Sequence, residues 1–342
     1  MATSLTIEQI AELAEVSRST VSRVLNNHPS VRQTVRDRVR QVMEEYNYAP
    51  QAAARSLASS RTDTLGLLIP RSPARTLSDP FISTMIQSLT ETCTSQGYFL
   101  MLAMVTADME PSFYNRILRG RHFDGIIMLS SDIDDPVLPL LIKDRTPLVM
   151  IGSHPYFQNV VSVDIENRAG ACEGVAHLIR LGHRRIGMIC GQLEMDSALA
   201  RRDGYKQALL EAGIPVDPAL MVEGHYTQEG AYAAMQRLLE LPNRPTAVFA
   251  SSDLMAAHAQ RAIQDAGLVV PDDIAMVGFD DLPISGISNP PLTTVHQPLT
   301  EMGVTAVRLL IEQVRDHRIV SSVRLPTRLV IRGSCGALGR HQ

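Results

Sequence analysis

From Thr64 onward, the sequence alternates short apolar runs with stretches of helical periodicity. Apolar runs of this length, bounded by turn residues, are typical of strands buried on both faces, and such strands alternating with helices form parallel sheets. The alternation fills residues 62–342, which is more than one hydrophobic core usually holds. We therefore expect an α/β region of two doubly wound parallel-sheet subdomains. The predicted strands are LGLLIP, YFLMLAMV, GIIMLSS, PLVMIGS, VVSVDI, RIGMICG, TAVFASSD, IAMVGFDD and TTVHQP.

The first 46 residues follow a different pattern, with three short amphipathic helices. Thr6 and Gln9 form a capping-box pattern before a helix that should end near Ala14. Ser17 can cap a second helix, and a third helix follows it. Two helices joined by a short turn, with polar residues and arginines on the second, predict a helix-turn-helix whose second helix enters the major groove of DNA. A small helical bundle that binds nothing is the alternative.

The charge distribution agrees with a DNA-binding N-terminus. The chain carries a net charge of −4, yet residues 1–61 hold eight Arg against six Asp and Glu, which leaves −6 for the remainder. A basic surface suits DNA phosphates, although such a cluster is often only a solvated face.

Residues 47–61 read as a weak helix that links the two regions. Pro50 suits a first helical position and the alanines favour helix, but the apolar positions Ala54, Leu57 and Ala58 are few. A helix this short is unstable alone in water, so we expect it to form only when packed or bound to DNA.

The segments LTIEQIAELAEVSRSTVSRVLNN and NYAPQAAARSLASSRTDTLGLLIP resemble the lactose/galactose repressor (LacI/GalR) family, and the similarity continues to about Leu329. The resemblance implies an all-α helix-turn-helix headpiece (1–46), a hinge helix (47–61) and a core of periplasmic-binding-protein type I architecture (62–342) that binds an effector and dimerises. In that core the N-subdomain would comprise about 62–162 plus 291–320, and the C-subdomain about 163–290 plus 321–342. The three crossings between them would then fall near Ser162, Pro290–Thr293 and Val320.

The same resemblance assigns the DNA contacts. Arg18 and Ser19 would read bases, because arginine suits the O6 and N7 atoms of guanine. Leu57 would wedge into the minor groove and bend the DNA, unless it merely packs against the core. Glu15 stands where the family usually has Gly in the turn, and Arg32 and Val35 replace the usual Ser and Thr. The predicted DNA-binding residues are Thr6, Ser17, Arg18, Ser19, Thr20, Ser22, Arg23, Asn26, Ala54 and Leu57.

Ligands of open parallel sheets lie beyond the carboxyl ends of the strands, so we expect the effector between the two sheets. By resemblance, the Asp253 carboxylate and the Arg201 guanidinium form a polar clamp for a polyhydroxylated ligand. A helix N-cap for Asp253 and a surface ion pair for Arg201 are the plainer alternatives. Gly152 stands where the family often has Asp, so Ser153 could supply that contact. The predicted effector-binding residues are Asp79, Phe81, Ser130, Arg201, Tyr226, Asp253 and Asp280.

The lack of a signal sequence predicts a cytoplasmic protein, and the resemblance implies a homodimeric repressor of a palindromic operator, whose affinity for that operator a sugar inducer lowers. A purine or other corepressor stays open as the alternative effector. The acidic groups Asp132, Asp134 and Asp135, and the pair Asp280 and Asp281, could suggest an enzyme, but no catalytic motif accompanies them. A periplasmic binding protein would need a signal peptide and would not carry a helix-turn-helix. The four cysteines have no metal-ligand spacing, we expect no cofactor, and the C-terminus lacks the leucine heptads of a tetramer.

Overall fold

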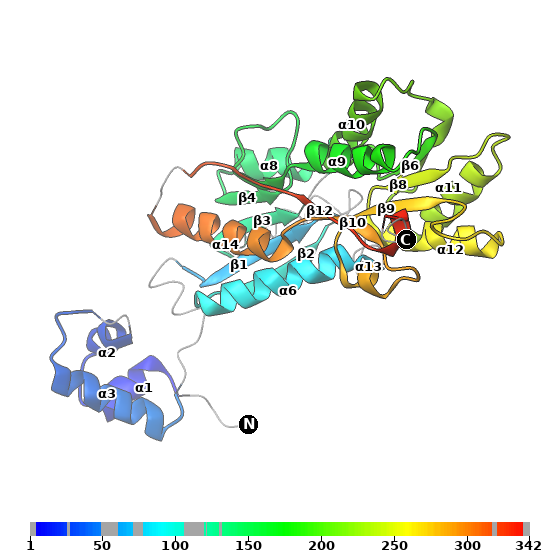
Figure 1. The fold of residues 1–342 in the computed structure, drawn as a ribbon. Coiled ribbons are helices and arrows are strands. Elements are labelled where there is room, and N and C mark those ends of the chain that lie inside the picture. Colours follow the sequence, from blue (N-terminus) through cyan, green and yellow to red (C-terminus); the bar gives the residue numbers. More distant parts are fainter. Residues whose placement is uncertain are drawn as a thin grey trace. The chain divides into compact units, whose positions relative to one another are not determined.

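The computed structural model describes residues 5–25, 28–48, 61–70, 78–105, 120, 122–129, 132–316 and 320–337 (Figure 1). The chain divides into two compact units, residues 1–63 and 64–342. We describe each unit by itself. None of the helices in the described ranges has the length and apolar character needed to cross a membrane. The hinge segment, including Ala54 and Leu57, and the predicted contacts Asn26 and Ser130 fall outside the described residues.

The first unit contains the three predicted helices. They are α1 (Ile7–Leu13), α2 (Arg18–Leu25) and α3 (Gln33–Glu45). Ile10, Val21 and Val39, one from each helix, are fully buried and form the centre of a small core. The capping box also forms: the Thr6 side chain accepts from the backbone N–H of Gln9, and the Gln9 side chain accepts from that of Thr6. The apolar spacing of the sequence therefore predicted this unit closely.

The turn between α1 and α2 contains one residue, Glu15, in the left-handed conformation. The N–H of Val16 donates to the carbonyl of Ala11, and the N–H of Glu15 donates to that of Glu12, which is the Schellman arrangement. Glu15 adopts a φ of 52°, a conformation that favours glycine because a Cβ is crowded there. The departure from glycine seen in the sequence thus coincides with a strained backbone.

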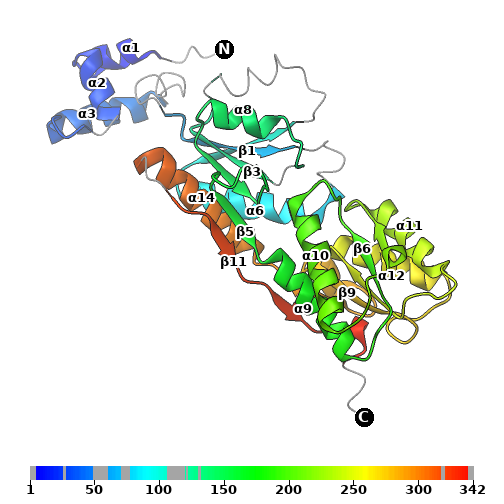
Figure 2. The same cartoon turned by 90° about the horizontal axis from the view of Figure 1, so that it is seen from above.

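The second unit contains two six-stranded sheets, which define an N-subdomain and a C-subdomain (Figure 2). The N-subdomain sheet has the order β11-β5-β4-β3-β1-β2, and the C-subdomain sheet has the order β12-β10-β9-β8-β6-β7. All neighbouring strands are parallel except β10 and β12. The strands are β1 (Thr64–Ile69), β2 (Phe99–Met104), β3 (Gly125–Leu129), β4 (Leu148–Ile151), β5 (Ser162–Ile165), β6 (Ile186–Cys190), β7 (Met221–Glu223), β8 (Ala247–Ala250), β9 (Ala275–Asp280), β10 (Thr293–His296), β11 (Val323–Leu325) and β12 (Arg328–Val330).

Helices pack on both faces of each sheet, which explains why the central strands are apolar at every position. In the N-subdomain, Leu67 and Ile127 pack with helices α6 (Pro80–Ser95) and α14 (Leu299–Asp316), whereas Leu68 and Ile126 pack with α8 (Val137–Lys143). The C-subdomain follows the same scheme. Its helices are α9 (Asn167–Arg180), α10 (Asp196–Glu211), α11 (Gln228–Leu239), α12 (Asp253–Asp265) and α13 (Pro283–Ile287), with two 3-10 turns, η1 (Pro218–Leu220) and η2 (Gly333–Cys335).

All nine predicted strands form, but the three crossings fall later in the chain than the sequence indicated. Strand β5 pairs with β4 and β11 with β5, so both belong to the N-subdomain, whereas β10 pairs with β9 in the C-subdomain. Each crossing therefore follows a completed strand. The reason is that a chain leaves a parallel sheet at the carboxyl end of its strand, not at its start. The crossings lie after Ile165, after His296, and between Leu325 and Arg328.

We predict that Glu15→Gly stabilises the first unit by up to about 1 kcal/mol, because glycine removes the crowding at a positive φ. The exposed ion pair that Glu15 forms with Arg38, at 3.6 Å, contributes little and offsets little of this gain. Hydrogen exchange of peptides from residues 5–25 in the full chain measures the effect. Glu15→Asn, which tolerates the left-handed region, should give part of it. Faster exchange in Glu15→Gly would contradict the prediction.

Candidate functional site

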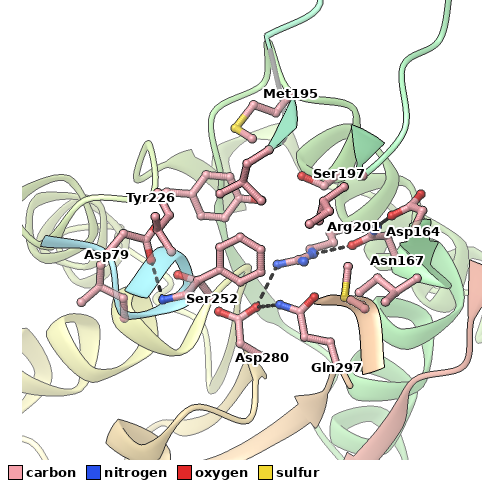
Figure 3. A pocket seen from close by; sticks show the side chains of 18 of the residues that line it. Asp79, Asp164, Asn167, Met195, Ser197, Arg201, Tyr226, Ser252, Asp280 and Gln297 are labelled. Carbon is pink, nitrogen blue, oxygen red and sulfur yellow. Dashed lines mark hydrogen bonds and ion pairs between the residues drawn. The ribbon is translucent and has the colours of Figure 1, made fainter. Parts of the chain in front are cut away.

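A cleft of about 720 Å³, its open mouth included, lies between the two sheets (Figure 3). Its N-subdomain wall includes Ile69, Leu129 and Ile151, the last residues of β1, β3 and β4. Its C-subdomain wall includes Asp280, the last residue of β9, and Ser252, which follows β8. The carboxyl ends of the parallel strands thus meet at one cavity, as expected for ligand sites in such sheets.

Arg201, on α10, is the buried cation of the cleft. Its Nε donates to Oδ1 of Asn167 at 2.9 Å, and one terminal nitrogen donates to the carbonyl of Ser251 at 2.6 Å. The same nitrogen lies 3.4 Å from Oδ1 of Asp280, and the guanidinium carbon lies 3.7 Å above the ring centre of Phe279. A buried guanidinium needs such partners, because burial without them costs several kcal/mol. The surface ion pair considered from the sequence is therefore wrong.

Asp280 is the counter-charge to Arg201, and it is 5% exposed. Nε2 of Gln297 donates to its Oδ1 at 2.6 Å. Burial raises the pKa of Asp280 to about 7, although Arg201 opposes this rise and Asp79 adds to it. Its φ is 118°, and that of Asp281 is 61°. Such backbone conformations cost on the order of 1–3 kcal/mol each and concentrate at functional sites.

Three further predicted residues line the same cleft: Asp79, Phe81 and Tyr226. Asp79 caps α6, and its Oδ1 accepts from the N–H of Phe81 at 3.0 Å. Tyr226 follows β7 with a φ of 55°. Its ring lies against Gly191, where an added Cβ would come within 2.1 Å of the ring. Glycine at position 191 therefore makes room for the tyrosine, and both subdomains present an aromatic ring to the cleft.

Asp253 does not belong to the cleft wall. It is fully buried at the first position of α12, and it is absent from the residues that line the cavity. Its Oδ2 accepts from the N–H of Leu282 at 2.8 Å, and its Oδ1 accepts from the hydroxyl of Thr294 at 2.5 Å. Burial raises its pKa well above the usual range, and neighbouring Asp280 raises it further. Asp253 thus joins α12 to β10 and to the turn after β9. The helix cap is Ser252, the residue before it.

Sequence reasoning missed several polar residues of the cleft wall. Asn167 follows β5, Gln297 follows β10, and Ser252 follows β8. Each could have been found by the rule that ligand contacts follow strand ends. Gly152 lines the cleft, whereas the Ser153 hydroxyl lies 2.8 Å from Asp164 and 2.5 Å from Asp196. Ser153 thus bonds to protein carboxylates, and it is not among the residues that line the cavity.

The acidic residues that suggested an enzyme have other partners. Oδ1 of Asp132 accepts from Gln192 at 3.1 Å, and the carboxylate of Asp135 accepts from the N–H of Val137 at 2.7 Å. Asp281 pairs with Arg332. In the described parts of the chain, no group of three or more acidic, His or Cys side chains could hold a metal ion.

In the first unit, the predicted DNA contacts lie on the outer face of α2 and at the start of α1. Arg18, Ser19 and Arg23 are exposed, and Thr20 and Ser22 are half-buried. The hydroxyl of Ser17 accepts from the N–H of Thr20 at 3.2 Å, so it caps α2. Arg18 pairs with Glu8 of α1 at 3.1 Å, and Thr6 lies exposed at the tip of α1. The polar face is thus free of the core that Val21 and Val24 enter.

A helix-turn-helix unit joined to a two-subdomain binding fold defines a class of ligand-controlled regulators. Residues 6–51 match the family model described as bacterial regulatory proteins of the lacI family, and residues 175–335 match the periplasmic binding protein-like domain. The chain is 35% identical over 313 residues to the HTH-type transcriptional repressor PurR of Aliivibrio salmonicida, which covers 91% of this chain and 92% of that one.

Two solved structures are also similar to the chain. The complex of the transcriptional regulator CelR with cellobiose has 34% identity and a TM-score of 0.74, and the match covers 96% of this chain and 99% of that one. The lac repressor dimer, bound to operator and the anti-inducer ONPF, has 27% identity and a TM-score of 0.85, with coverages of 97% and 99%. The chain belongs to the LacI family, and it is a DNA-binding transcriptional regulator.

We predict that the stability of the second unit falls as the pH rises from about 4 to 7. The folded chain holds the Asp280 proton up to about pH 7, whereas an unfolded chain releases it near pH 4, so folding binds protons over this range. Asp280→Asn should flatten the dependence by up to about 1 kcal/mol per pH unit. Urea unfolding at pH 5 to 8 measures it. Asp272→Asn, at an exposed position, is the control, and equal slopes in wild type and Asp280→Asn would refute the prediction.

Proposed function

We propose that the chain is a cytoplasmic transcriptional repressor: a homodimer that binds a palindromic operator and releases it when an uncharged sugar occupies the cleft. The observation that carries this proposal is the buried pair of Arg201 and Asp280, facing a cleft in the same chain as a helix-turn-helix. The proposed role is regulatory and involves no catalytic step.

The headpiece, residues 1–46, would supply the operator contacts. Arg18 and Ser19 would reach base edges, Arg23 a further base, and Thr6, Thr20, Ser22 and Asn26 the phosphates. Residues 47–61 would order as a hinge helix on the operator, with Ala54 at the DNA and Leu57 wedged between base pairs. Two such headpieces on a dimer would read half-sites about one helical turn apart.

The cleft chemistry favours an uncharged polyol. Among the described residues that line the cleft, Arg201 is the one cation, and the carboxyl groups are those of Asp79, Asp164 and Asp280. A ligand phosphate would meet this acidic surround, whereas ligand hydroxyls can donate to carboxylates and accept from the guanidinium. Phe81 and Tyr226 offer flat faces to the apolar side of a sugar ring. The similar CelR structure holds cellobiose.

The regulatory mechanism would be a change in the relative placement of the two subdomains. Ligand contacts come from both sheets, so a bound sugar favours the placement that completes them. That placement would set the spacing of the hinge helices and so the operator affinity, with a coupling of typically about 1–3 kcal/mol. Ser130, which follows β3 in the sequence and lies outside the described residues, is proposed as a further effector contact.

A purine corepressor is the second candidate effector, because the rings of Phe81 and Tyr226 would also stack on a flat base. The two candidates differ in sign. A sugar inducer would weaken operator binding, and a corepressor would strengthen it. A thermal-shift screen of glucose, galactose, ribose, cellobiose, their phosphates, and purines separates them.

We predict that the sugar found by this screen weakens operator binding about 5- to 150-fold, the usual range of allosteric coupling. Linkage requires the operator to weaken sugar binding by the same factor. Fluorescence anisotropy of a labelled operator and calorimetry with the sugar measure the two factors. Arg201→Met should abolish the sugar effect and keep operator binding. Equal sugar affinity with and without operator would overturn the proposed mechanism.

We predict that Arg18→Ala weakens binding to the specific operator about 10- to 100-fold, since a bidentate contact with guanine contributes about 1–3 kcal/mol. Binding to unrelated DNA should weaken far less. Arg38→Ala removes the same charge from α3 instead of the recognition helix α2 and is the matched control. An equal loss on specific and unrelated DNA would assign Arg18 to phosphate contact instead.

A further inference from the structure

Beside the cleft, three half-buried side chains form a cluster: Asp281, His296 and Arg332. A terminal nitrogen of Arg332 lies 2.6 Å from Oδ1 of Asp281, and Nδ1 of His296 lies 3.0 Å from its Oδ2. None of the three belongs to the residues that line the cleft. The cluster therefore lies behind the cleft wall.

The pairing of β9 with β10 places this cluster next to the binding residues. Asp280 is in register with His296. Asp280 and Gln297 line the cleft, and Asp280 accepts from Gln297 at 2.6 Å. Their sequence neighbours Asp281 and His296 contact each other. The contact between Asp280 and Gln297 therefore lies directly beside the contact between Asp281 and His296, at the ends of β9 and β10.

The strained backbone at Asp280 and Asp281 must be stabilised by contacts from other segments. Both residues have positive φ, at 118° and 61°, and such conformations persist only where the surroundings impose them. Arg332 can provide such a contact, because it is itself fixed: its other terminal nitrogen donates to the carbonyl of Leu292 at 2.9 Å and lies 3.1 Å from the hydroxyl of Ser285. The carboxylate of Asp281 is thereby held at both oxygens.

The cluster also adjoins two of the three subdomain crossings. His296 is the last residue of β10, directly before the chain crosses to α14. His296 is also in register with Arg328, the first residue of β12, which follows the crossing from β11. A displacement of β10 or β12 at these crossings would therefore shift Asp281, and through the backbone also Asp280.

We propose that Asp281, His296 and Arg332 are positioning residues for the effector: they hold Asp280 toward Arg201 and tie the cleft wall to two crossings. The inference rests on the proposed function of the cleft. The positioning residues would act without touching the sugar, so their loss would weaken sugar binding while operator binding by the sugar-free protein stays.

Asp281→Asn is the decisive variant, because asparagine has the same size and tolerates positive φ, so only the ion pair is lost. We expect sugar affinity, measured by calorimetry with the sugar from the screen, to fall about tenfold or more. Arg332→Met should give a similar loss, and Arg332→Lys a smaller one. Asp217→Asn, which breaks the ion pair with Arg185 in the same subdomain, is the matched control and should change nothing.

A double variant separates positioning from general stability. If Asp281 and Arg332 act as one unit, Asp281→Asn with Arg332→Met should weaken sugar binding no more than either change alone. Additive losses, or wild-type affinity in Asp281→Asn, would overturn the inference. Should Asp281→Asn fail to fold, Arg332→Lys and His296→Gln carry the same comparison.

A second readout does not depend on the sugar. Hydrogen exchange over residues 279–283 should be faster in Asp281→Asn than in wild type, with no change over α11, which packs on β6 and β7 at the opposite edge of the sheet. Unchanged exchange at 279–283 would overturn the positioning inference. Absence of any sugar binding by the wild type would instead overturn the proposed function, so the two failures are distinguishable.

Discussion

The buried pair of Arg201 and Asp280 is the constraint around which the second unit is organised. A guanidinium inside a protein requires a counter-charge and hydrogen-bond acceptors. Here they come from the ends of three segments: Asn167 after β5, the carbonyl of Ser251 after β8, and Asp280 at the end of β9. Because these contacts satisfy the charge only when the strand ends converge, the pair also fixes the shape of the C-subdomain wall. A ligand that enters therefore finds its polar partners already oriented.

The sequence predicted the architecture well, because buried parallel strands leave a strong signal. Runs such as GIIML and IAMVGF are apolar at every position, since helices cover both of their faces. Strands β7, β11 and β12 were not predicted, as each has only three residues and its side chains are mostly half-buried or exposed. The sequence showed Glu15 where the family usually has glycine, and the structure gives this residue a positive φ. Local pattern thus suffices for the longer apolar strands, the exposed edge strand β2 included, and it fails for strands of three residues.

The site was predicted in part. Arg201, Asp79, Phe81, Tyr226 and Asp280 do line one cleft. Both Asp253 and Asp280 lie at strand ends, where ligand contacts are expected. The Asp253 side chain nevertheless points into the protein, where it accepts hydrogen bonds from Leu282 and Thr294. Neighbours in sequence, Ser252 and Asp253, thus have opposite environments. That choice depends on how α12 starts above the sheet, which residue spacing does not encode.

The C-terminal segment gives one strand to each subdomain, β11 to the N-subdomain and β12 to the C-subdomain. Neither sheet is complete until residues 323–330 have been synthesised. During synthesis, one edge of β5 in the N-subdomain and one edge of β10 in the C-subdomain therefore stay unpaired until residues 323–330 are available. Because the chain passes between the subdomains three times, no single cleavage separates them. Each subdomain is thus structurally distinct but is not made from one continuous segment that could fold alone.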